Sequence, residues 1–170
     1  EWQKSFSEAR NYSLQFATCD WILQIDADEE MEQEDIPLLR KTLRKADKNR
    51  DVNAIFVAIY NELPSGRSKH YFQRIFRRDR AHYEGIVHNQ LIFEGKAITS
   101  EIRFYHYGYN LSSEDMAKKH ERTGNLLRQQ IEKNPDNTFA RMNLVRIYRN
   151  QGNFEKAIEE AKTSLELYSD

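Results

Sequence analysis

The sequence predicts an α/β domain followed by a region made of helices. Three apolar segments have the length and composition of strands, and they span 21–25, 52–60 and 71–78. From Ser112 the chain becomes charged, and its apolar residues recur at helical spacing. A hydrophobic content of 39% over 170 residues is enough for a compact core, although the mean hydropathy is strongly negative.

The first predicted strand runs directly into an acidic motif, Asp26-Ala27-Asp28, which is followed by Glu29 and Glu30. Because side chains alternate along a strand, we expect Asp26 and Asp28 on one side of it and Ala27 on the other. Two carboxylates on the same side of a buried strand are costly unless a positive group lies between them. A hard divalent cation fits there, and with only one or two carboxylate ligands it keeps positions open for the oxygens of a diphosphate.

Three other interpretations compete for the acidic motif. An EF-hand loop starting at Asp26 needs glycine at its sixth position and glutamate at its twelfth, where this chain has Met31 and Pro37, so that interpretation fails. A phosphatase motif of the Asp-x-Asp-x-Thr/Val type needs a hydroxyl or a branched apolar residue where this chain has Glu30. A solvated turn of acids that follows a strand by chance remains open, so the surrounding sequence has to decide.

The residues around the acidic motif favour the metal site. Upstream, Ala9, Leu14 and Phe16 fall at roughly helical spacing, so we expect a helix that leads into the acidic strand. Five short motifs then follow one another in order: ARN at 9–11, WILQIDADE at 21–29, QRIFR at 73–77, YEGIVH at 83–88 and YHYGY at 105–109. This combination resembles the second half of a family-2 glycosyltransferase with the GT-A fold.

The resemblance implies metal-dependent, inverting transfer of a sugar from a nucleotide-sugar donor, in the first instance a UDP-sugar. It implies that Asp28 binds Mn²⁺ or Mg²⁺ directly and that Asp26 faces the ribose or the sugar of the donor. The cation neutralises charge on the departing diphosphate, which needs no proton from the protein. His88, and after it His106, match family histidines that complete the coordination; the alternative for either is a histidine at a sheet edge satisfied by its own hydrogen bonds.

An inverting transfer also needs a base within hydrogen-bonding reach of the acceptor proton. The candidate is Glu84, and Glu29 and Glu30 beside the acidic motif are also available. Many relatives have a glutamate directly after the histidine, where this chain has Asn89. The identity of the base therefore stays open, with a purely structural Glu84 as the alternative.

Three arginines lie in motifs where they could contact phosphate oxygens, with which guanidinium groups pair well: Arg10, Arg74 and Arg77. Most arginines in an amphipathic strand such as 73–77 form its solvated face. We therefore predict a donor-binding role for Arg10 alone.

The start of the chain has no counterpart of the strand and helix that cradle the nucleotide base in the family. The resemblance thus implies that 1–111 form the C-terminal part of a GT-A domain, with an incomplete Rossmann-like sheet. We expect an excised fragment or a truncated chain. Such a chain should bind the donor weakly and turn over little, because half of the nucleotide pocket is absent.

The region 112–170 contains a second resemblance. A helix is expected over 113–133. After it, the spacing of the leucine, tyrosine, glycine, aromatic and alanine positions resembles one 34-residue tetratricopeptide unit over about 136–169, with Gly152 at its turn. An ordinary helical hairpin is the alternative.

One such repeat cannot bury its own faces, so we expect it to pack on the helix 113–133 and on further repeats. The helices are expected to bind a protein, peptide or glycan acceptor or to mediate oligomer formation. The two resemblances together imply a family-2 transferase fused to tetratricopeptide repeats, which is an arrangement known in bacteria. The alternative function is a protein-interaction module in which the α/β part is catalytically silent.

Composition limits the other partners. With 26 basic and 27 acidic residues, no charge surplus favours nucleic acid or an anionic membrane. No apolar stretch approaches the roughly twenty residues that an integral membrane helix needs. The single cysteine, Cys19, rules out an internal disulfide, and we expect a cytoplasmic protein.

Overall fold

The computed structural model describes residues 5–63, 66–87, 89–108 and 112–168. Contacts between residues divide the chain into two compact units. The sheet unit comprises 12–82 and 91–111, and the helical unit comprises 1–11, 83–90 and 112–170.

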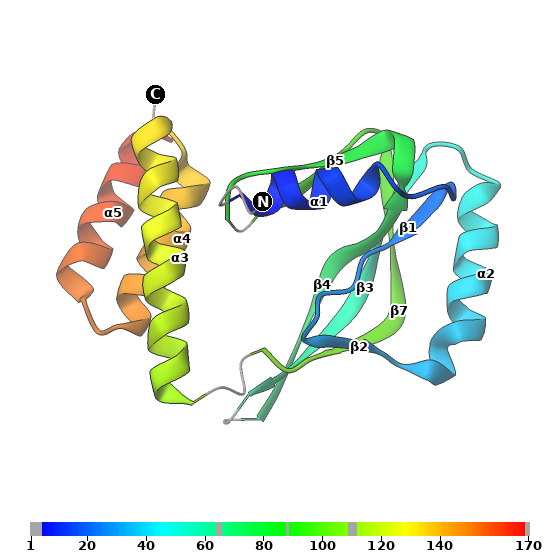
Figure 1. The fold of residues 1–170 in the computed structure, drawn as a ribbon, viewed down its shortest axis with the longest axis horizontal. Helices are drawn as coiled ribbons and strands as arrows, with labels where there is room; N and C mark the ends of the chain where they lie inside the picture. The colour runs from blue at the N-terminus through cyan, green and yellow to red at the C-terminus, as the bar shows by residue number, and fades with distance from the viewer. Residues whose placement is uncertain (1–4, 64–65, 88, 109–111, 169–170) are drawn as a thin grey trace. The chain divides into compact units, whose positions relative to one another are not determined.

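The sheet unit is built on a five-stranded mixed sheet in the order β1-β4-β3-β7-β2 (Figure 1). Along the chain the strands are β1 (Trp21–Leu23), β2 (Glu29–Met31), β3 (Val52–Leu63), β4 (Gly66–Arg77) and β7 (Lys96–His106). The central strand β3 runs antiparallel to β4 and parallel to β7, whereas β1 and β2 pair antiparallel at the two edges. The strands predicted over 52–60 and 71–78 thus lie in β3 and β4.

The core of the sheet unit forms where α2 (Ile36–Asp47) packs against the sheet (Figure 1). Three leucines of this helix, Leu38, Leu39 and Leu43, contact a set of buried strand residues: Val52, Ile55, Val57, Ile59, Ile75, Ile102 and Phe104. The sequence prediction did not include α2, although its leucines recur at helical spacing.

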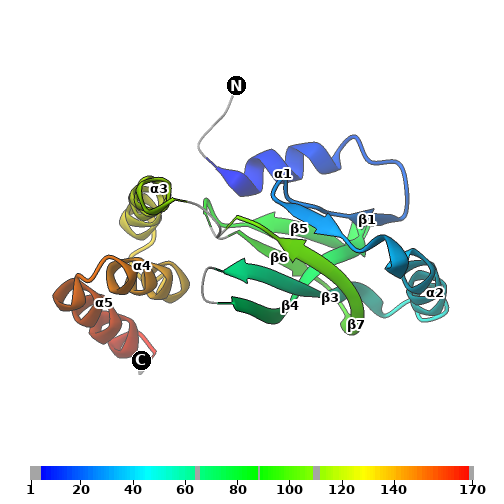
Figure 2. The same ribbon diagram turned by 90° about the horizontal axis from the view of Figure 1, so that it is seen from below.

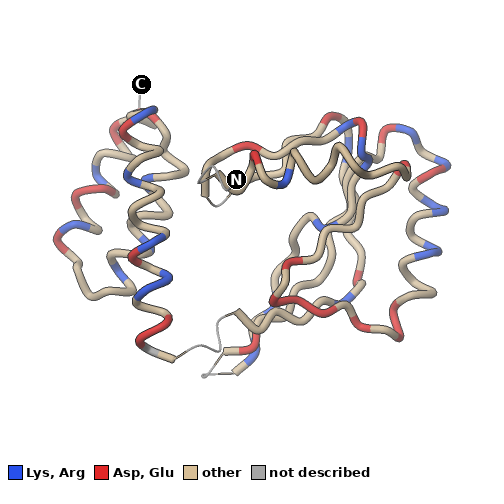
Figure 3. The backbone as a smooth tube through the Cα atoms, in the orientation of Figure 1, with Lys and Arg blue, Asp and Glu red and all other residues tan. Residues whose placement is uncertain are grey.

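One partly buried ion pair fixes the start of α2. Asp35 ends a short 3-10 turn, η1 (Gln33–Asp35), and its carboxylate accepts hydrogen bonds from the backbone nitrogen, Nε and Nη2 of Arg103 at 2.8, 2.9 and 2.9 Å. The hydrogen bonds from the Arg103 side chain hold the pKa of Asp35 below its usual range. The segment between β2 and α2 is thereby tied to β7, in a part of the sheet unit where acidic residues gather (Figure 3).

The prediction of a buried strand ending in Asp26-Ala27-Asp28 is wrong in its geometry. β1 covers only Trp21–Leu23, lies at the sheet edge, and leaves Leu23 and the following Ile25 exposed. Residues 24–28 lie outside any strand, and a turn closes where the Glu29 nitrogen donates to the Asp26 carbonyl oxygen at 3.0 Å. Strand alternation therefore does not decide where the two aspartates point.

A smaller, two-stranded sheet pairs β5 (Ala81–Glu84) with β6 (Gln90–Phe93), and a 3-10 turn, η2 (Arg78–Arg80), leads into β5. The helix predicted before the acidic motif is α1 (Phe6–Leu14), and the ARN motif lies inside it.

The C-terminal helices of the helical unit are α3 (Ser113–Lys133), α4 (Thr138–Asn150) and α5 (Phe154–Glu166), with α4 packed between α3 and α5 (Figure 2). Their core contains Leu127, Ala140, Leu144 and Ile147. The helix expected over 113–133 is present, and α4 and α5 form the predicted pair around Gly152. The predicted fold class, a partial α/β domain followed by helices, is confirmed. None of the described helices is both long enough and apolar enough to cross a membrane.

Gly152→Ala is expected to destabilise the protein by about 1–2 kcal/mol, because a left-handed backbone brings Cβ against the following carbonyl oxygen. The φ angle of Gly152 is 74°, and no atom lies within 4 Å of an added Cβ, so the backbone conformation causes the effect. The control Gly124→Ala, inside α3, should stabilise by about 0.5–1 kcal/mol, since its Cβ would meet the flexible Arg128 side chain at 3.4 Å or more. Urea unfolding measures the free energy of unfolding of both variants. A change in the same direction for both substitutions would contradict this explanation.

Candidate functional site

The acidic turn meets the end of β7 at Asp28. The backbone nitrogen of Tyr107 donates to the Asp28 carbonyl oxygen at 2.9 Å, which fixes the turn beside β7. The Asp28 carboxylate Oδ2 then lies 3.3 Å from Nε2 of His106. The Asp28 side chain is 46% exposed and that of His106 is 15% exposed, so this pair is open to solvent on the aspartate side.

Gly108 makes this close approach possible. A Cβ added at Gly108 would lie 2.1 Å from Asp28 Oδ2 and 2.7 Å from His106 Nε2. Both distances are shorter than real Cβ contacts, so any side chain at this position would displace the carboxylate or the imidazole. The glycine of the YHYGY motif therefore leaves space at the point where the two polar groups meet.

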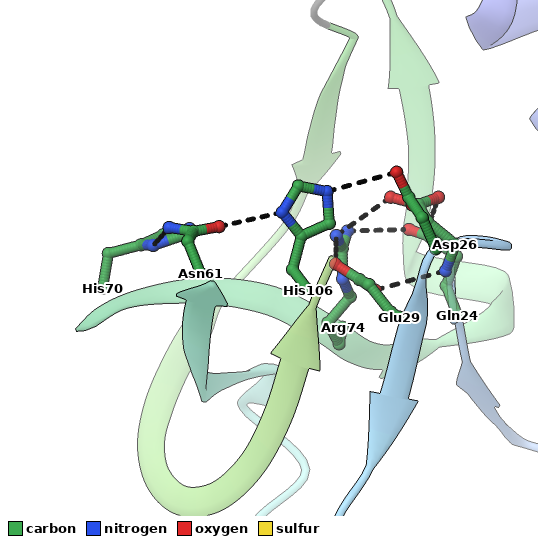
Figure 4. Close-up of polar contacts among 8 residues, drawn as sticks. Gln24, Asp26, Glu29, Asn61, His70, Arg74 and His106 are labelled. Carbon is green, nitrogen blue, oxygen red and sulfur yellow. Dashed lines mark hydrogen bonds and ion pairs between the residues drawn. The ribbon is translucent and has the colours of Figure 1, made fainter. Parts of the chain in front are cut away.

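The second ring nitrogen of His106, Nδ1, contacts Asn61 near the end of β3 (Figure 4). Asn61 Oδ1 lies 2.9 Å from His106 Nδ1, and Asn61 Nδ2 lies 3.1 Å from His70 Nδ1 and 3.2 Å from Ser68 Oγ. Desolvation lowers the pKa of His70, and the neighbouring charge of Arg74 acts in the same direction. The His70 ring is therefore favoured in its neutral form.

Asp26 points to a different group, the guanidinium of Arg74. Arg74 Nη2 lies 3.0 Å from Asp26 Oδ2 and also pairs with Glu29, while Gln24 Nε2 donates to Asp26 Oδ1 at 2.7 Å (Figure 4). The Arg74 side chain is 8% exposed and that of Glu29 is 1% exposed. The expectation that Arg74 belongs to a solvated strand face is wrong, because its charge is needed to neutralise two carboxylates of the acidic turn.

These contacts narrow the choice of a base. Glu29 is buried and ion-paired, which makes it a poor candidate for taking a proton from an acceptor. Glu30 is exposed and accepts from the Tyr107 hydroxyl at 3.3 Å.

The Asp28–His106 pair fits a divalent cation in its donor chemistry. A carboxylate oxygen and an imidazole nitrogen are common ligands of Mn²⁺, and Mg²⁺ binds through one or two carboxylates together with phosphate oxygens. Within the described residues, no three His, Cys, Asp or Glu side chains come together as a metal-binding group. The other predicted ligand, His88, lies outside the described residues.

Two predicted site residues belong to the helical unit. Arg10 stacks over the ring of Tyr83 at 5.2 Å, and Glu84 is an exposed residue at the end of β5. The neighbour of Arg10 in the ARN motif, Asn11, exchanges two hydrogen bonds of 2.8 Å with the backbone of Tyr83. These contacts of Arg10, Asn11 and Tyr83 join the ARN and YEGIVH motifs within this unit.

Sequence reasoning missed three residues of the site: Asn61, His70 and Gly108. Asn61 follows the long apolar run of β3, and Gly108 lies in a motif in which only the histidine was predicted to belong to the site. A polar residue directly after an apolar strand was the available signal for Asn61. Its register opposite His106 follows only from the parallel pairing of β3 with β7.

Comparisons with known proteins agree with this architecture. The family model of glycosyl transferase family 2 matches residues 1–104, and that of the tetratricopeptide repeat matches residues 116–170. Two similar proteins are the SPbeta prophage-derived glycosyltransferase SunS of Bacillus subtilis (strain 168) and glycosyltransferase SunS of Bacillus phage SPbeta. Each is 27% identical over 173 residues, covering 99% of this chain and 40% of the relative. The chain thus spans about two fifths of the length of these relatives.

Arg74→Met is expected to lower the free energy of unfolding by about 3–5 kcal/mol, because it leaves the buried Glu29 carboxylate without its cation. The double variant Arg74→Met/Glu29→Gln should recover much of this loss, since the remaining group is neutral. Arg80→Met is the matched control, because the Arg80 side chain is 54% exposed. Urea denaturation of the four proteins decides, and an Arg74→Met variant as stable as the control would show that the pair contributes little.

Proposed function

Because the chain belongs to glycosyl transferase family 2, we propose that it forms part of an enzyme that transfers a sugar from a nucleotide-sugar donor, with a divalent cation bound by Asp28 and His106. The observation that supports this most directly is the meeting of Asp28 Oδ2 and His106 Nε2 at 3.3 Å beside Gly108. A carboxylate and an imidazole from separate motifs meet beside a glycine that has no side chain to displace either group.

Each residue of the site has its own proposed role in binding the donor. Asp28 and His106 would hold the cation, which when bound neutralises charge on the leaving diphosphate. Asp26 is oriented by Gln24 and Arg74, its side chain is 32% exposed, and it would accept hydrogen bonds from the ribose or the sugar. Glu84 stays our candidate for the base and Arg10 for a phosphate contact.

The finer details of the reaction are part of the same proposal. We propose a UDP-sugar as donor, inversion at the sugar and Mn²⁺ or Mg²⁺ as cation, on the strength of the family motifs. His88 is proposed as a further ligand, and 1–111 and 112–170 as the two domains. These assignments are proposals for the enzyme as a whole, because the chain spans about two fifths of the length of the relatives it matches.

The helical region supports a role in binding a protein or peptide. Three large apolar side chains of α5 are solvent-exposed: Phe154 at 61%, Ile158 at 56% and Leu165 at 69%. They recur at the spacing of one helix face, and apolar side chains gathered in this way mark contact surfaces. We propose that this face contacts a peptide or protein acceptor, or a second copy of the protein.

Thermal unfolding with ligands tests the cation site in the full-length protein that contains these residues. UDP and Mn²⁺ together are expected to raise the melting temperature, by an amount that corresponds to about 2.7 kcal/mol at a hundredfold excess over the dissociation constant. Either ligand alone should give a much smaller rise. Asp28→Asn is expected to abolish the joint effect, and Gly108→Ala to weaken it by displacing the carboxylate.

The control for this experiment is Asp79→Asn, because Asp79 is an exposed aspartate of η2 with a side chain 70% accessible. This variant should respond to UDP and Mn²⁺ as the unaltered protein does. An Asp28→Asn protein that keeps the full joint shift would contradict the proposal and would favour a protein-interaction module with a silent α/β part.

A further inference from the structure

The contact between Asn61 and His106 gives Asn61 a role in the candidate site. We propose that Asn61 is a positioning residue, which fixes His106 in the tautomer with its proton on Nδ1 and thereby directs the Nε2 lone pair toward Asp28 and a bound cation. This inference rests on the proposed function, because it treats Nε2 as a metal-binding atom.

The first step concerns the hydrogen bond between Asn61 and His106. The amide oxygen of Asn61 can only accept, so His106 Nδ1, at 2.9 Å, has to donate. A neutral imidazole has a single N–H, and its other nitrogen then carries a lone pair. With the proton on Nδ1, that lone pair lies on Nε2, the atom that faces Asp28.

The second step concerns the orientation of the Asn61 amide. Its NH₂ group has two partners, Ser68 Oγ at 3.2 Å and His70 Nδ1 at 3.1 Å. A neutral His70 accepts at Nδ1 in its Nε2–H tautomer, and the lowered pKa of His70 favours the neutral ring. If the amide were flipped, Ser68 Oγ and His70 Nδ1 would both have to donate to the Asn61 oxygen. Because Asn61 is only 8% exposed, water competes little for these contacts.

The third step concerns the space between His106 and Asp28. A carboxylate oxygen 3.3 Å from Nε2 favours a positive species at this contact, either a proton on Nε2 or a metal ion that binds both atoms. Gly108 has no side chain that would displace the Asp28 carboxylate or the His106 ring from this contact. In metal sites, a partner that orients the second nitrogen of a histidine ligand serves this purpose, and its loss typically weakens metal binding 10–100-fold.

The protonation of each His106 ring nitrogen is measured from the ring ¹⁵N chemical shifts of the full-length protein. We expect an Nδ1–H ring in the unaltered protein. Asn61→Leu should change it to Nε2–H, whereas Asn61→Asp, which keeps an acceptor oxygen, should preserve Nδ1–H. An Nε2–H ring in the unaltered protein overturns the proposal, even if Asn61→Leu does not fold.

Asn53→Leu is the matched control, because Asn53 is a second buried asparagine of β3, and its amide donates to the Glu94 carbonyl oxygen at 2.7 Å. This variant tests whether loss of any buried amide from the strand changes the His106 ring. It should leave the ¹⁵N shifts of His106 unchanged, and a change equal to that of Asn61→Leu would overturn the specific role of Asn61.

Titration with Mn²⁺, followed by electron paramagnetic resonance, separates this inference from the proposed function. Asn61→Leu is expected to weaken Mn²⁺ binding about 10–100-fold, while Asn61→Asp and Asn53→Leu should stay close to the unaltered protein. If the unaltered protein binds no Mn²⁺, the proposed function is overturned and this inference with it. If it binds Mn²⁺ and Asn61→Leu binds equally well, only the positioning role is overturned.

Discussion

The buried charge of Arg74 is the constraint on which the arrangement of the acidic turn depends. Residues 24–28 belong to no strand, and isolated backbone hydrogen bonds, such as those from Gln24 to Arg74 and from Tyr107 to Asp28, hold them beside the sheet. Arg74 also reaches from β4 to Asp26 and Glu29, one on each side of Asp28 in the sequence. Because both carboxylates would be costly to bury alone, their pairing with one guanidinium stabilises a single conformation of the turn. That conformation brings the Asp28 carboxylate to His106.

The site combines residues that are far apart in the sequence because the sheet is mixed. β3 pairs on one side with β4, which provides Arg74 and His70, and on the other with β7, which provides His106. Asn61 lies opposite His106 in the parallel pairing and opposite Ser68 in the antiparallel one. A one-residue change in either register would turn these side chains to the opposite face. The long apolar strands therefore determine which polar residues can meet at their ends.

The sequence was sufficient for part of this picture. The family motifs identified Asp28 and His106 as candidate site residues. The helical spacing of apolar residues placed α3, α4 and α5 close to their observed positions. It failed for Arg74 and Asn61, because their roles come from cross-strand neighbours that a single strand pattern does not contain. The local conformation of the acidic motif was also out of reach, since an apolar segment before two aspartates does not reveal whether the strand continues through them. Here, strand alternation gave the wrong geometry for Asp26 and Asp28.

The two aspartates of the motif differ in how their charge is balanced, and this difference underlies the separate roles that we propose for them. Asp26 already has a fixed cation in Arg74 and a hydrogen-bond donor in Gln24, so a second cation would gain less there. Asp28 is more exposed and faces a histidine nitrogen. With a lone pair on that nitrogen, Asp28 and His106 together provide two metal-binding atoms and one negative charge. We therefore expect a metal ion to bind more strongly at such a pair than at Asp26, although Asp26 is only two residues away.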